Sequence, residues 1–358
     1  VMLKRDEPRT THIHIRGNFS QLGEAVEPAV PAFFPNQPDA SKIDRLALAR
    51  WMVRPDHPLT ARVAVNRFWQ HYFGTGLVAT PDDFGLQGAR PSHPALFDYL
   101  ATEFVESGWD IKAMQRLIVN SATYRQNAAA SREQIERDPE NRMLARGPRF
   151  RLPAEQIRDN VLAISGLLYK KLGGPSVYPP QPEGLLEEKG QLQYHPAWIT
   201  SSGRDQYRRG LYVYWKRMNL YPSLAAFGAP TRERCSVHRT LTNTPLQALV
   251  LLNDPVYVEA ARALADQIMA HGGDRTDAQI DYAMHRCLSR PPTSEEMDRY
   301  REFLNRQTDR YQENKEAAMQ LLHEEETTSE PTAKLAKRAA WTLLANVLLN
   351  LDETLSKP

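Results

Sequence analysis

Helical segments bounded by proline or glycine follow one another along most of this chain. The clearest is predicted over 153–169, where proline stands in the first turn, a position that tolerates it. Segments of this kind bury their apolar stripes by packing helix on helix, so they indicate a mainly α fold. In the segment 153–169 the stripe has the spacing i, i+4, i+7 and i+11: Ile157, Val161, Ile164 and Leu168.

The other elements follow from the same signals. One short strand is predicted at 11–15, and a second at 208–217, where Leu211, Val213 and Trp215 alternate with polar or tyrosine side chains. Residues 125–150 are polar and irregular. Further helices are predicted over 41–54, 59–73, 94–107, 110–124, 245–252, 254–270, 278–288, 294–323 and 334–351.

The expected architecture is an irregular multi-helix domain with a few short strands and long proline-rich loops. Residues 1–40 carry too many prolines for a long helix and are predicted to form an extended N-terminal arm. Residues 41–358 are predicted to form a single helical domain. It contains a long loop, 173–204, and a strand-bearing segment, 205–217. A loop of that length inside a compact domain is usually functional or disordered.

Composition excludes several classes of protein. The 45 Lys and Arg against 43 Asp and Glu give a net charge of +2, so nothing draws the chain generally to nucleic acid or an anionic membrane. No apolar run approaches the ~18–20 residues of a membrane helix. No Cys-x-x-Cys-His motif occurs, so we expect no c-type haem and no cofactor in this chain.

The two cysteines, Cys235 and Cys287, cannot form a disulfide framework or a four-cysteine zinc site. They could pair in an oxidising compartment, but two unpaired small core residues are the favoured interpretation. His12 and His14 share one strand face and could be half of a metal site, but no third ligand lies near them in sequence. We therefore expect no metal.

Arginine use is more informative, because 34 of the 45 basic residues are Arg and 11 are Lys. Arginine suits planar, two-bonded recognition and partly buried ion pairs. In the helix 59–73, Arg62, Asn66 and Trp69 fall on one stripe. Such a stripe is either the wall of a pocket or a polar network that fixes neighbouring helices, and the structural network is favoured.

A second cluster surrounds Glu155 and Asp159, which lie at i, i+4 and repel unless a cation sits between them. Arg158, Arg62 or a metal could supply that cation. Paired carboxylates can perform acid–base chemistry, but an arginine-bridged structural cluster at a helix start is favoured. Basic and aromatic residues also interleave over 207–217, yet an amphipathic strand explains them better than a nucleic-acid platform.

A series of motifs then resembles a known family. They are Pro58-Leu59-Thr60-Ala61-Arg62-Val63, Asn66-Arg67-Phe68-Trp69-Gln70-His71, Asp83-Phe84-Gly85, Gly108-Trp109, Ser121-Ala122-Thr123-Tyr124-Arg125-Gln126 and Thr242-Asn243-Thr244-Pro245-Leu246-Gln247. Together, from about Arg16 to Leu351, they resemble the planctomycete-type domain of unknown function that ends large secreted proteins. The chain departs from the family at Gly228, where relatives tend to carry an acidic residue, so any role of that acid is missing here.

The resemblance implies an extracytoplasmic domain of a longer polypeptide. A cytochrome-c-like domain, which would hold haem, and a second uncharacterised domain would precede it, so Val1 is expected to be a cut start. The resemblance also implies a polysaccharide context, without an agreed activity.

These observations predict a binding or interaction module with one polar cleft. Its partners would be the upstream domains or an anionic glycan, with no nucleic acid and no membrane span. An alternative stays open, a glycan-cleaving enzyme with Glu155 and Asp159 as acid and base, ~5–10 Å apart across an open cleft. The candidate ligand-binding residues are Arg62, Asn66, Arg67, Trp69, Arg151, Glu155, Arg158, Asp159, Arg208, Arg209, Arg217 and Arg239.

Overall fold

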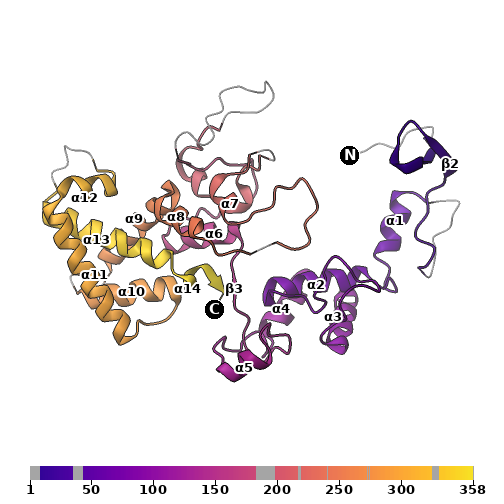
Figure 1. Ribbon diagram of the computed structural model, residues 1–358, viewed down its shortest axis with the longest axis horizontal. Helices are drawn as coiled ribbons and strands as arrows, with labels where there is room; N and C mark the ends of the chain where they lie inside the picture. Colours follow the sequence, from indigo (N-terminus) through magenta and orange to yellow (C-terminus); the bar gives the residue numbers. More distant parts are fainter. Residues whose placement is uncertain are drawn as a thin grey trace. The chain divides into compact units, whose positions relative to one another are not determined.

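The computed structural model is mainly α-helical with a few short strands, which confirms the predicted fold class (Figure 1). Its contacts form two compact units, and the division falls in the polar segment 125–150. Unit 1 comprises Val1–Gln126 and Asp138–Met143, and unit 2 comprises Asn127–Arg137 and Leu144–Pro358. The structure describes residues 9–34, 43–182, 198–216, 219–239, 241–271, 273, 275–324 and 330–357.

Unit 1 begins with a small antiparallel hairpin. His12 pairs with Ala25 in the hairpin, and nearly all of its residues are exposed. The described part of the predicted extended arm, 9–34, therefore contains paired strands. The elements of unit 1 are β1 (Thr11–His14), β2 (Leu22–Val26), α1 (Arg45–Met52), α2 (Thr60–Phe73), α3 (Pro94–Glu106) and α4 (Ile111–Asn120), with a 3-10 turn at Ile15–Gly17.

Helices α2, α3 and α4 pack against one another and make the core of unit 1. Val65 of α2, Phe97 and Phe104 of α3 and Met114 of α4 are buried there. Local sequence sets the ends of these helices. Asp110 caps α4 by accepting a hydrogen bond from the backbone N–H of Ala113 at 3.0 Å, which satisfies one of the free donors of the first turn.

Unit 2 is larger and holds most of the helices. A short antiparallel ladder, in which Arg151 pairs with Ser356, brings a segment near the start of the unit beside its C-terminal residues. Its elements are α5 (Arg132–Arg137), β3 (Phe150–Arg151), α6 (Ala154–Ile164), α7 (Pro222–Ala226), α8 (Pro245–Asn253), α9 (Pro255–Ala270), α10 (Thr276–Leu288), α11 (Ser294–Glu313), α12 (Lys315–Leu322), α13 (Thr332–Leu349), α14 (Asp352–Leu355) and β4 (Ser356–Lys357).

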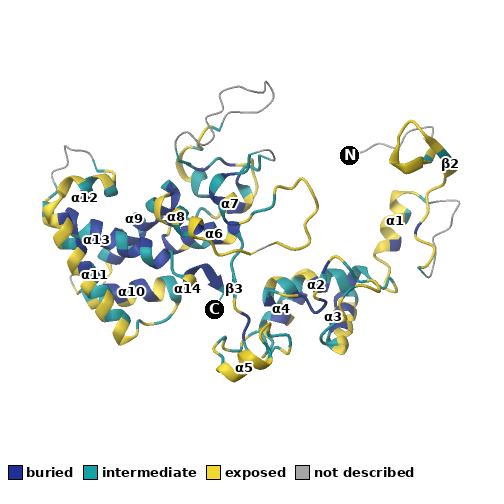
Figure 2. Ribbon diagram, viewed as in Figure 1, coloured by how far each residue is buried: buried dark blue, intermediate teal, exposed yellow. Residues whose placement is uncertain are grey.

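Helix α13 forms the centre of the unit 2 core and packs against α9 and α11 (Figure 2). Small residues are frequent on the two facing helices: Ala260, Ala261 and Ala265 on α9, and Ala339, Ala340 and Ala345 on α13, all almost wholly buried. Side chains of this size let two helix backbones approach closely. Larger residues, including Trp341 and Leu264, fill the space beside them.

The strand predicted over 208–217 does not form in the described part of that range. The chain instead makes two 3-10 turns, Gly203–Tyr207 and Gly210–Tyr212, and two isolated bridges, Tyr169 to Arg208 and Val177 to Val213. The prediction failed because the alternating residues do not share one environment: Val213 is buried, whereas Leu211 is exposed. The ends of the predicted loop 173–204 are described, and its residues 183–197 lie outside the described range.

No helix among the described residues is long and apolar enough to span a membrane.

Candidate functional site

The predicted stripe on α2 divides into a structural part and an accessible part. Asn66 is completely buried, and its amide clasps the backbone of Val78: Nδ2 donates to the carbonyl at 3.0 Å, and Oδ1 accepts from the N–H at 2.9 Å. A Cβ on Gly76 would lie only 2.5 Å from this amide, so the position requires glycine. Asn66 therefore fixes the loop that follows α2.

Arg62, on the same stripe, is partly accessible and pairs with Asp98 of α3. Its Nη2 donates to Asp98 Oδ1 at 2.7 Å, Nε donates to the same oxygen at 3.1 Å, and Nη1 donates to the carbonyl of Pro58 at 2.8 Å. A guanidinium carries five N–H groups. Two of them, together with Asp98 Oδ2, have no protein partner among the described residues. The pair thus offers donors and an acceptor side by side.

Two cavities of unit 1 share Arg62 as a lining residue. The larger, about 220 Å³, places the Arg62–Asp98 pair beside the rings of Phe84 and Phe97 and the prolines Pro91 and Pro94. The other, about 170 Å³, is lined by residues that include His57, Arg62, Thr102 and Glu106. An apolar wall with a few convergent polar groups is the usual composition of a small-ligand site.

The remaining predicted residues of α2 have different surroundings. Trp69 is buried and stacks on Phe73 with ring centroids 4.1 Å apart, so it belongs to the core. Arg67 is exposed and has no polar partner among the described residues. Among the four residues predicted on this helix, Arg62 is therefore the candidate for ligand binding, because it has a polar partner and also lines a cavity.

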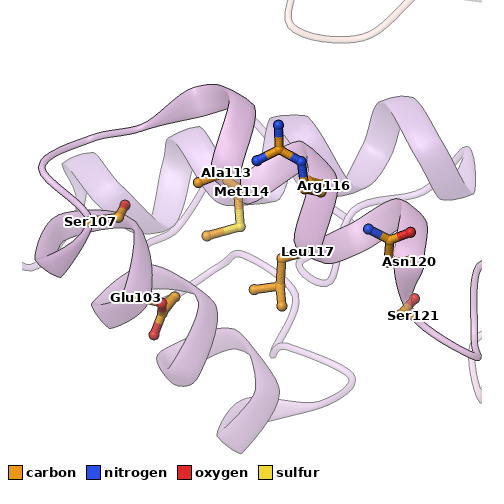
Figure 3. A pocket seen from close by; sticks show the side chains of 8 residues that line it. All are labelled: Glu103, Ser107, Ala113, Met114, Arg116, Leu117, Asn120 and Ser121. Atoms are coloured by element: carbon orange, nitrogen blue, oxygen red, sulfur yellow. The ribbon is translucent and has the colours of Figure 1, made fainter.

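A larger cavity, about 540 Å³, lies between α3 and α4 of unit 1 and was not predicted. Figure 3 shows Met114 and Leu117 of α4 facing the helix that carries Glu103, with Arg116 and Asn120 at the rim. The sequence does not indicate this cavity, because the apolar pattern of 110–124 is typical of a core helix. Leu117 is in fact exposed. Its polar neighbours at i−1 and i+3, Arg116 and Asn120, are the signal that could have shown this.

The two carboxylates predicted on α6 are each held by a different arginine of unit 2. Glu155 Oε2 lies 2.6 Å from Nη1 of Arg239. Asp159 Oδ2 lies 3.2 Å from Nε of Arg209, and its Oδ1 accepts from the backbone N–H of Gly210 at 2.6 Å. These contacts relieve the repulsion expected between two acids at i, i+4. They also direct both carboxylates to protein partners.

Two further predicted arginines of unit 2 are only 1% exposed and bind backbone carbonyls. Arg158 donates from Nη2 to Gln206 O at 2.7 Å. Arg208 donates to Pro175 O at 3.1 Å, to Lys171 O at 3.2 Å and to Gly173 O, and it stacks on Tyr212. These carbonyls belong to loop residues and to the 3-10 turn Gly203–Tyr207, so both side chains hold irregular backbone in place.

Of the last two predicted residues, Arg151 is described by the structure and Arg217 is not. Arg151 is largely buried on β3, with Nη1 3.7 Å from Asp352 Oδ1. Burial lowers the pKa of Arg151, and Asp352 partly opposes that effect. Arg217 lies outside the described residues. The predicted set is thus distributed over both units, with Arg62, Asn66, Arg67 and Trp69 in unit 1.

Arg158 also belongs to a buried polar group that sequence reasoning did not identify. Asp254, the N-cap of α9, is buried near it, and desolvation raises the pKa of this carboxyl to about 6 despite the Val256 N–H and the Arg158 charge. Burial likewise raises the pKa of Tyr221 and Tyr257. The sequence predicts only that a helix begins at Asp254, and nothing local indicates that this residue is buried.

Cys235 and Cys287 are both free, as predicted, but Cys235 is exposed, so the prediction that both are core residues is wrong for Cys235. Burial raises the pKa of the Cys287 thiol to about 12, so this side chain behaves as a small apolar group. His12 donates from Nδ1 to the carbonyl of Gly23 at 3.0 Å. In the part of the chain that the structure describes, no three His, Cys, Asp or Glu side chains gather as a metal site.

The fold and these contacts define a class: a two-unit helical protein in which arginines bind loop carbonyls and carboxylates, with small cavities in unit 1. The family model described as a protein of unknown function, DUF1553 (PSD1), matches residues 44–304. The match covers more than half of the chain, which therefore belongs to this family. No curated protein and no solved structure matches the chain.

Proposed function

We propose that this chain is a binding module and that its unit 1 holds one hydroxyl-bearing ring of a glycan at Arg62 and Asp98. The observation that carries the proposal is the place of the Arg62 guanidinium, on the wall of two cavities, with two N–H groups that bind no described residue. Adjacent sugar hydroxyls both donate and accept, so the free N–H groups of Arg62 and the free oxygen of Asp98 complement them.

The cavity walls support the same ligand class. Phe84, Phe97, Pro91 and Pro94 present apolar surface beside the ion pair, and the apolar face of a sugar ring can lie on such surface. The volume of about 220 Å³ is below the ~300–1,000 Å³ of drug-sized ligand sites. The cavity therefore suits one ring of a longer chain rather than a large compact ligand.

Charge sets the preference among glycans. Arg62 is neutralised by Asp98 at 2.7 Å, so a uronate or sulfate would compete with Asp98 for the same guanidinium. An uncharged ring is therefore favoured over the anionic glycan expected from the sequence. Both belong in the test.

The hydrolase alternative has less support. Glu155 and Asp159 are both bound to arginines, and the cavities described above are lined by unit 1 residues. A hydrolase needs both acids directed at a substrate in an open cleft. From the family resemblance we retain the proposal that the module works outside the cytoplasm beside a cytochrome-c-like domain. Fractionation of cells that make the full-length protein tests this.

A glycan array followed by thermal shift tests the binding proposal. Arg62→Ala is compared with Arg54→Ala, a matched control, because Arg54 forms an exposed pair with Asp56 at 2.9 Å but lines neither cavity. We expect array hits for the unchanged chain and for Arg54→Ala, and none for Arg62→Ala. Equal hits for both variants, or no hits for the unchanged chain, would refute the proposal.

A further inference from the structure

The two cavities that share Arg62 follow one another along α3. Residues of 94–98, in the first half of the helix, line the cavity of about 220 Å³, and residues of 101–106, in its second half, line the cavity of about 170 Å³. The second cavity is nearly as large as the first, so a ring of the size that suits one also suits the other. Arg62 lines both and therefore lies where the two cavities adjoin.

One polar stripe of α3 passes both cavities. Asp98, Thr102 and Glu106 stand at i, i+4 and i+8, so they share a face of the helix. At a rise of 1.5 Å per residue this stripe is about 12 Å long, which exceeds the length of one sugar ring. All three residues are exposed, whereas Leu100 and Phe104 of the same helix are buried in the core. Side-chain oxygens therefore follow both cavities on one rigid element.

The Arg62 guanidinium can serve a ligand in each cavity. Its Nη1 uses one N–H on the carbonyl of Pro58, and its Nη2 uses one on Asp98 Oδ1. Each of these nitrogens carries a second N–H, and neither second N–H binds a described residue. The two available donors thus lie on different nitrogen atoms, so they can bind hydroxyls of two different rings.

The second cavity has polar and apolar groups of its own. Thr102 and Glu106 form no side-chain hydrogen bond or ion pair with a described residue, so a hydroxyl and a carboxylate are available there. His57, also in the wall, is held in place because its Nδ1 accepts from the N–H of Thr60 at 3.2 Å. Val105 adds apolar surface. A preformed wall with a few polar groups is typical of a ligand site.

We propose that the site in unit 1 spans two successive sugar rings, one in each cavity, with Arg62 beside the linkage that joins them. This inference rests on the proposed function, because it takes a glycan as the ligand. Thr102 and Glu106 bind hydroxyls of the second ring. Two carboxylates, those of Asp98 and Glu106, accompany the one guanidinium, so a uronate or sulfate is disfavoured in the second cavity too.

The test measures Kd by isothermal titration calorimetry for one-, two- and three-ring oligomers of the sugar that the chain binds on the array. For a β-1,4-glucan these probes are methyl glucoside, cellobiose and cellotriose. The test variant is Glu106→Ala. The matched control is Glu103→Ala, because Glu103 is another exposed glutamate of α3 but lines the cavity between α3 and α4 instead of these two. Circular dichroism checks that both variants stay folded.

We expect two rings to bind the unchanged chain and Glu103→Ala at least ten-fold more tightly than one ring, and a third ring to add less than two-fold. In Glu106→Ala the gain from the second ring should fall below three-fold. One-ring binding that requires Arg62, with no gain from a second ring or with the full gain kept in Glu106→Ala, overturns the two-ring span and leaves the proposed function standing. If no oligomer binds, or if Arg62→Ala binds as the unchanged chain does, both proposals fail.

Discussion

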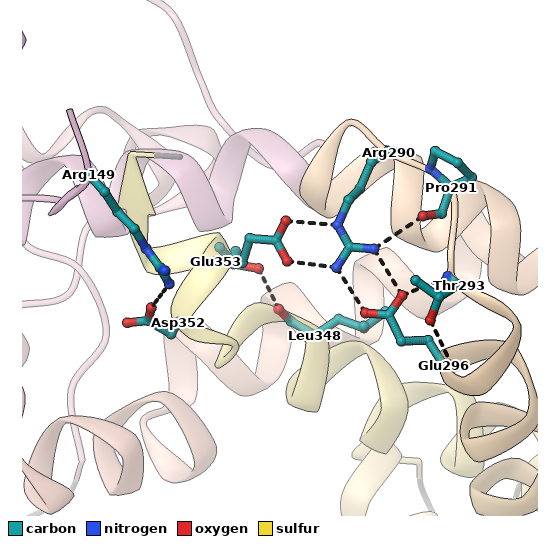
Figure 4. A network of polar contacts seen from close by, with 9 residues as sticks. Arg149, Arg290, Pro291, Thr293, Glu296, Leu348, Asp352 and Glu353 are labelled. Carbon is teal, nitrogen blue, oxygen red and sulfur yellow. Dashed lines mark hydrogen bonds and ion pairs between the residues drawn. The ribbon is translucent and has the colours of Figure 1, made fainter. Parts of the chain in front are cut away.

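Arg290 and Glu353 form a bidentate ion pair in unit 2. Nε of Arg290 donates to Oε1 of Glu353 at 2.8 Å, and Nη2 donates to Oε2 at 2.7 Å (Figure 4). The same guanidinium binds both oxygens of Glu296 at 2.9 Å. Its hydrogen bonds with Arg290 are the main reason that the pKa of Glu296 is lowered to about 2. One arginine thus joins α14 to the start of α11.

Arg290→Ala should destabilise unit 2. The substitution leaves the carboxylates of Glu296 and Glu353 close together without the guanidinium that both bind. Partly exposed bidentate ion pairs of this kind contribute about 1–2 kcal/mol to the free energy of unfolding. Urea unfolding measures the change. Arg299→Ala is the matched control, because Arg299 forms a more exposed i,i+4 pair with Glu295, and it should cost about 0.5 kcal/mol or less. Equal losses for the two variants would contradict this interpretation.

Asp254 should make stability depend on pH. Its pKa is raised from 3.8 to about 6 in the fold, so between these values the folded state binds more protons than the unfolded state. Stability therefore falls as pH rises through this window, by about 3 kcal/mol for a shift of ~2 pKa units. Tyr221 and Tyr257 also interact with Asp254, and burial raises the pKa of both tyrosines far above this window.

The measurement is the free energy of unfolding at pH 4, 5, 6 and 7 for the unchanged chain and for Asp254→Asn. Asparagine caps a helix about as well as aspartate, so the α9 cap is kept. Asp254→Asn should become relatively more stable as pH rises through the window. A constant difference between the two proteins would show that Asp254 has an ordinary pKa.

Buried Arg158 should behave unlike a surface arginine. Removing Arg158 leaves the Gln206 carbonyl without its hydrogen-bond donor and takes a favourable charge away from the buried Asp254 carboxylate. Leaving a buried charge uncompensated costs about 3–5 kcal/mol. Arg158→Ala is therefore expected to lower the unfolding free energy by that amount in urea titration. A loss below about 1 kcal/mol, typical of exposed pairs, would contradict the structural role.

The close approach of α9 and α13 gives a prediction about packing. Ala261 is completely buried in the helix-rich core of unit 2, so Ala261→Leu overfills it and should cost about 1–3 kcal/mol or more. Ala270→Leu, at the end of α9 where the side chain is exposed, is the control. Differential scanning calorimetry should show a lower Tm for the first variant. An unchanged Tm would show space between the helices.

Sequence periodicity predicted most helices but not all of their ends. The helix predicted over 153–169 ends at Ile164, because Gly166 adopts the left-handed conformation with φ of +74°. The single helix predicted over 294–323 is broken at Asn314, whose side chain caps α12 by accepting from Ala317 N–H. Gly166 in the first helix and Asn314 in the second could have indicated these breaks, but the apolar stripes that run past them predicted longer helices.

The candidate site was predictable only in part. The sequence showed that Arg62 and Asn66 share a helix face. In the structure Arg62 lines two cavities, whereas Asn66 is buried and binds the backbone of Val78. Their roles depend on Asp98 and Val78, which reach them from other segments of unit 1. The sequence also does not reveal that Leu246, Leu249 and Leu252 of α8 are exposed, because an apolar helix indicates core whichever of its faces turns outward.

The central claim is that Arg62 binds a ligand rather than stabilising the fold. The ligand is the glycan that the unchanged chain binds most strongly on the array. The direct measurement is the Kd of this glycan for the unchanged chain and for Arg62→Ala by isothermal titration calorimetry, with Arg54→Ala as the control. The Arg62 and Asp98 side chains are 38% and 61% exposed, so their ion pair contributes about 1 kcal/mol or less to stability. We predict at least ten-fold weaker binding by a folded Arg62→Ala protein. An unchanged Kd for Arg62→Ala would contradict the account.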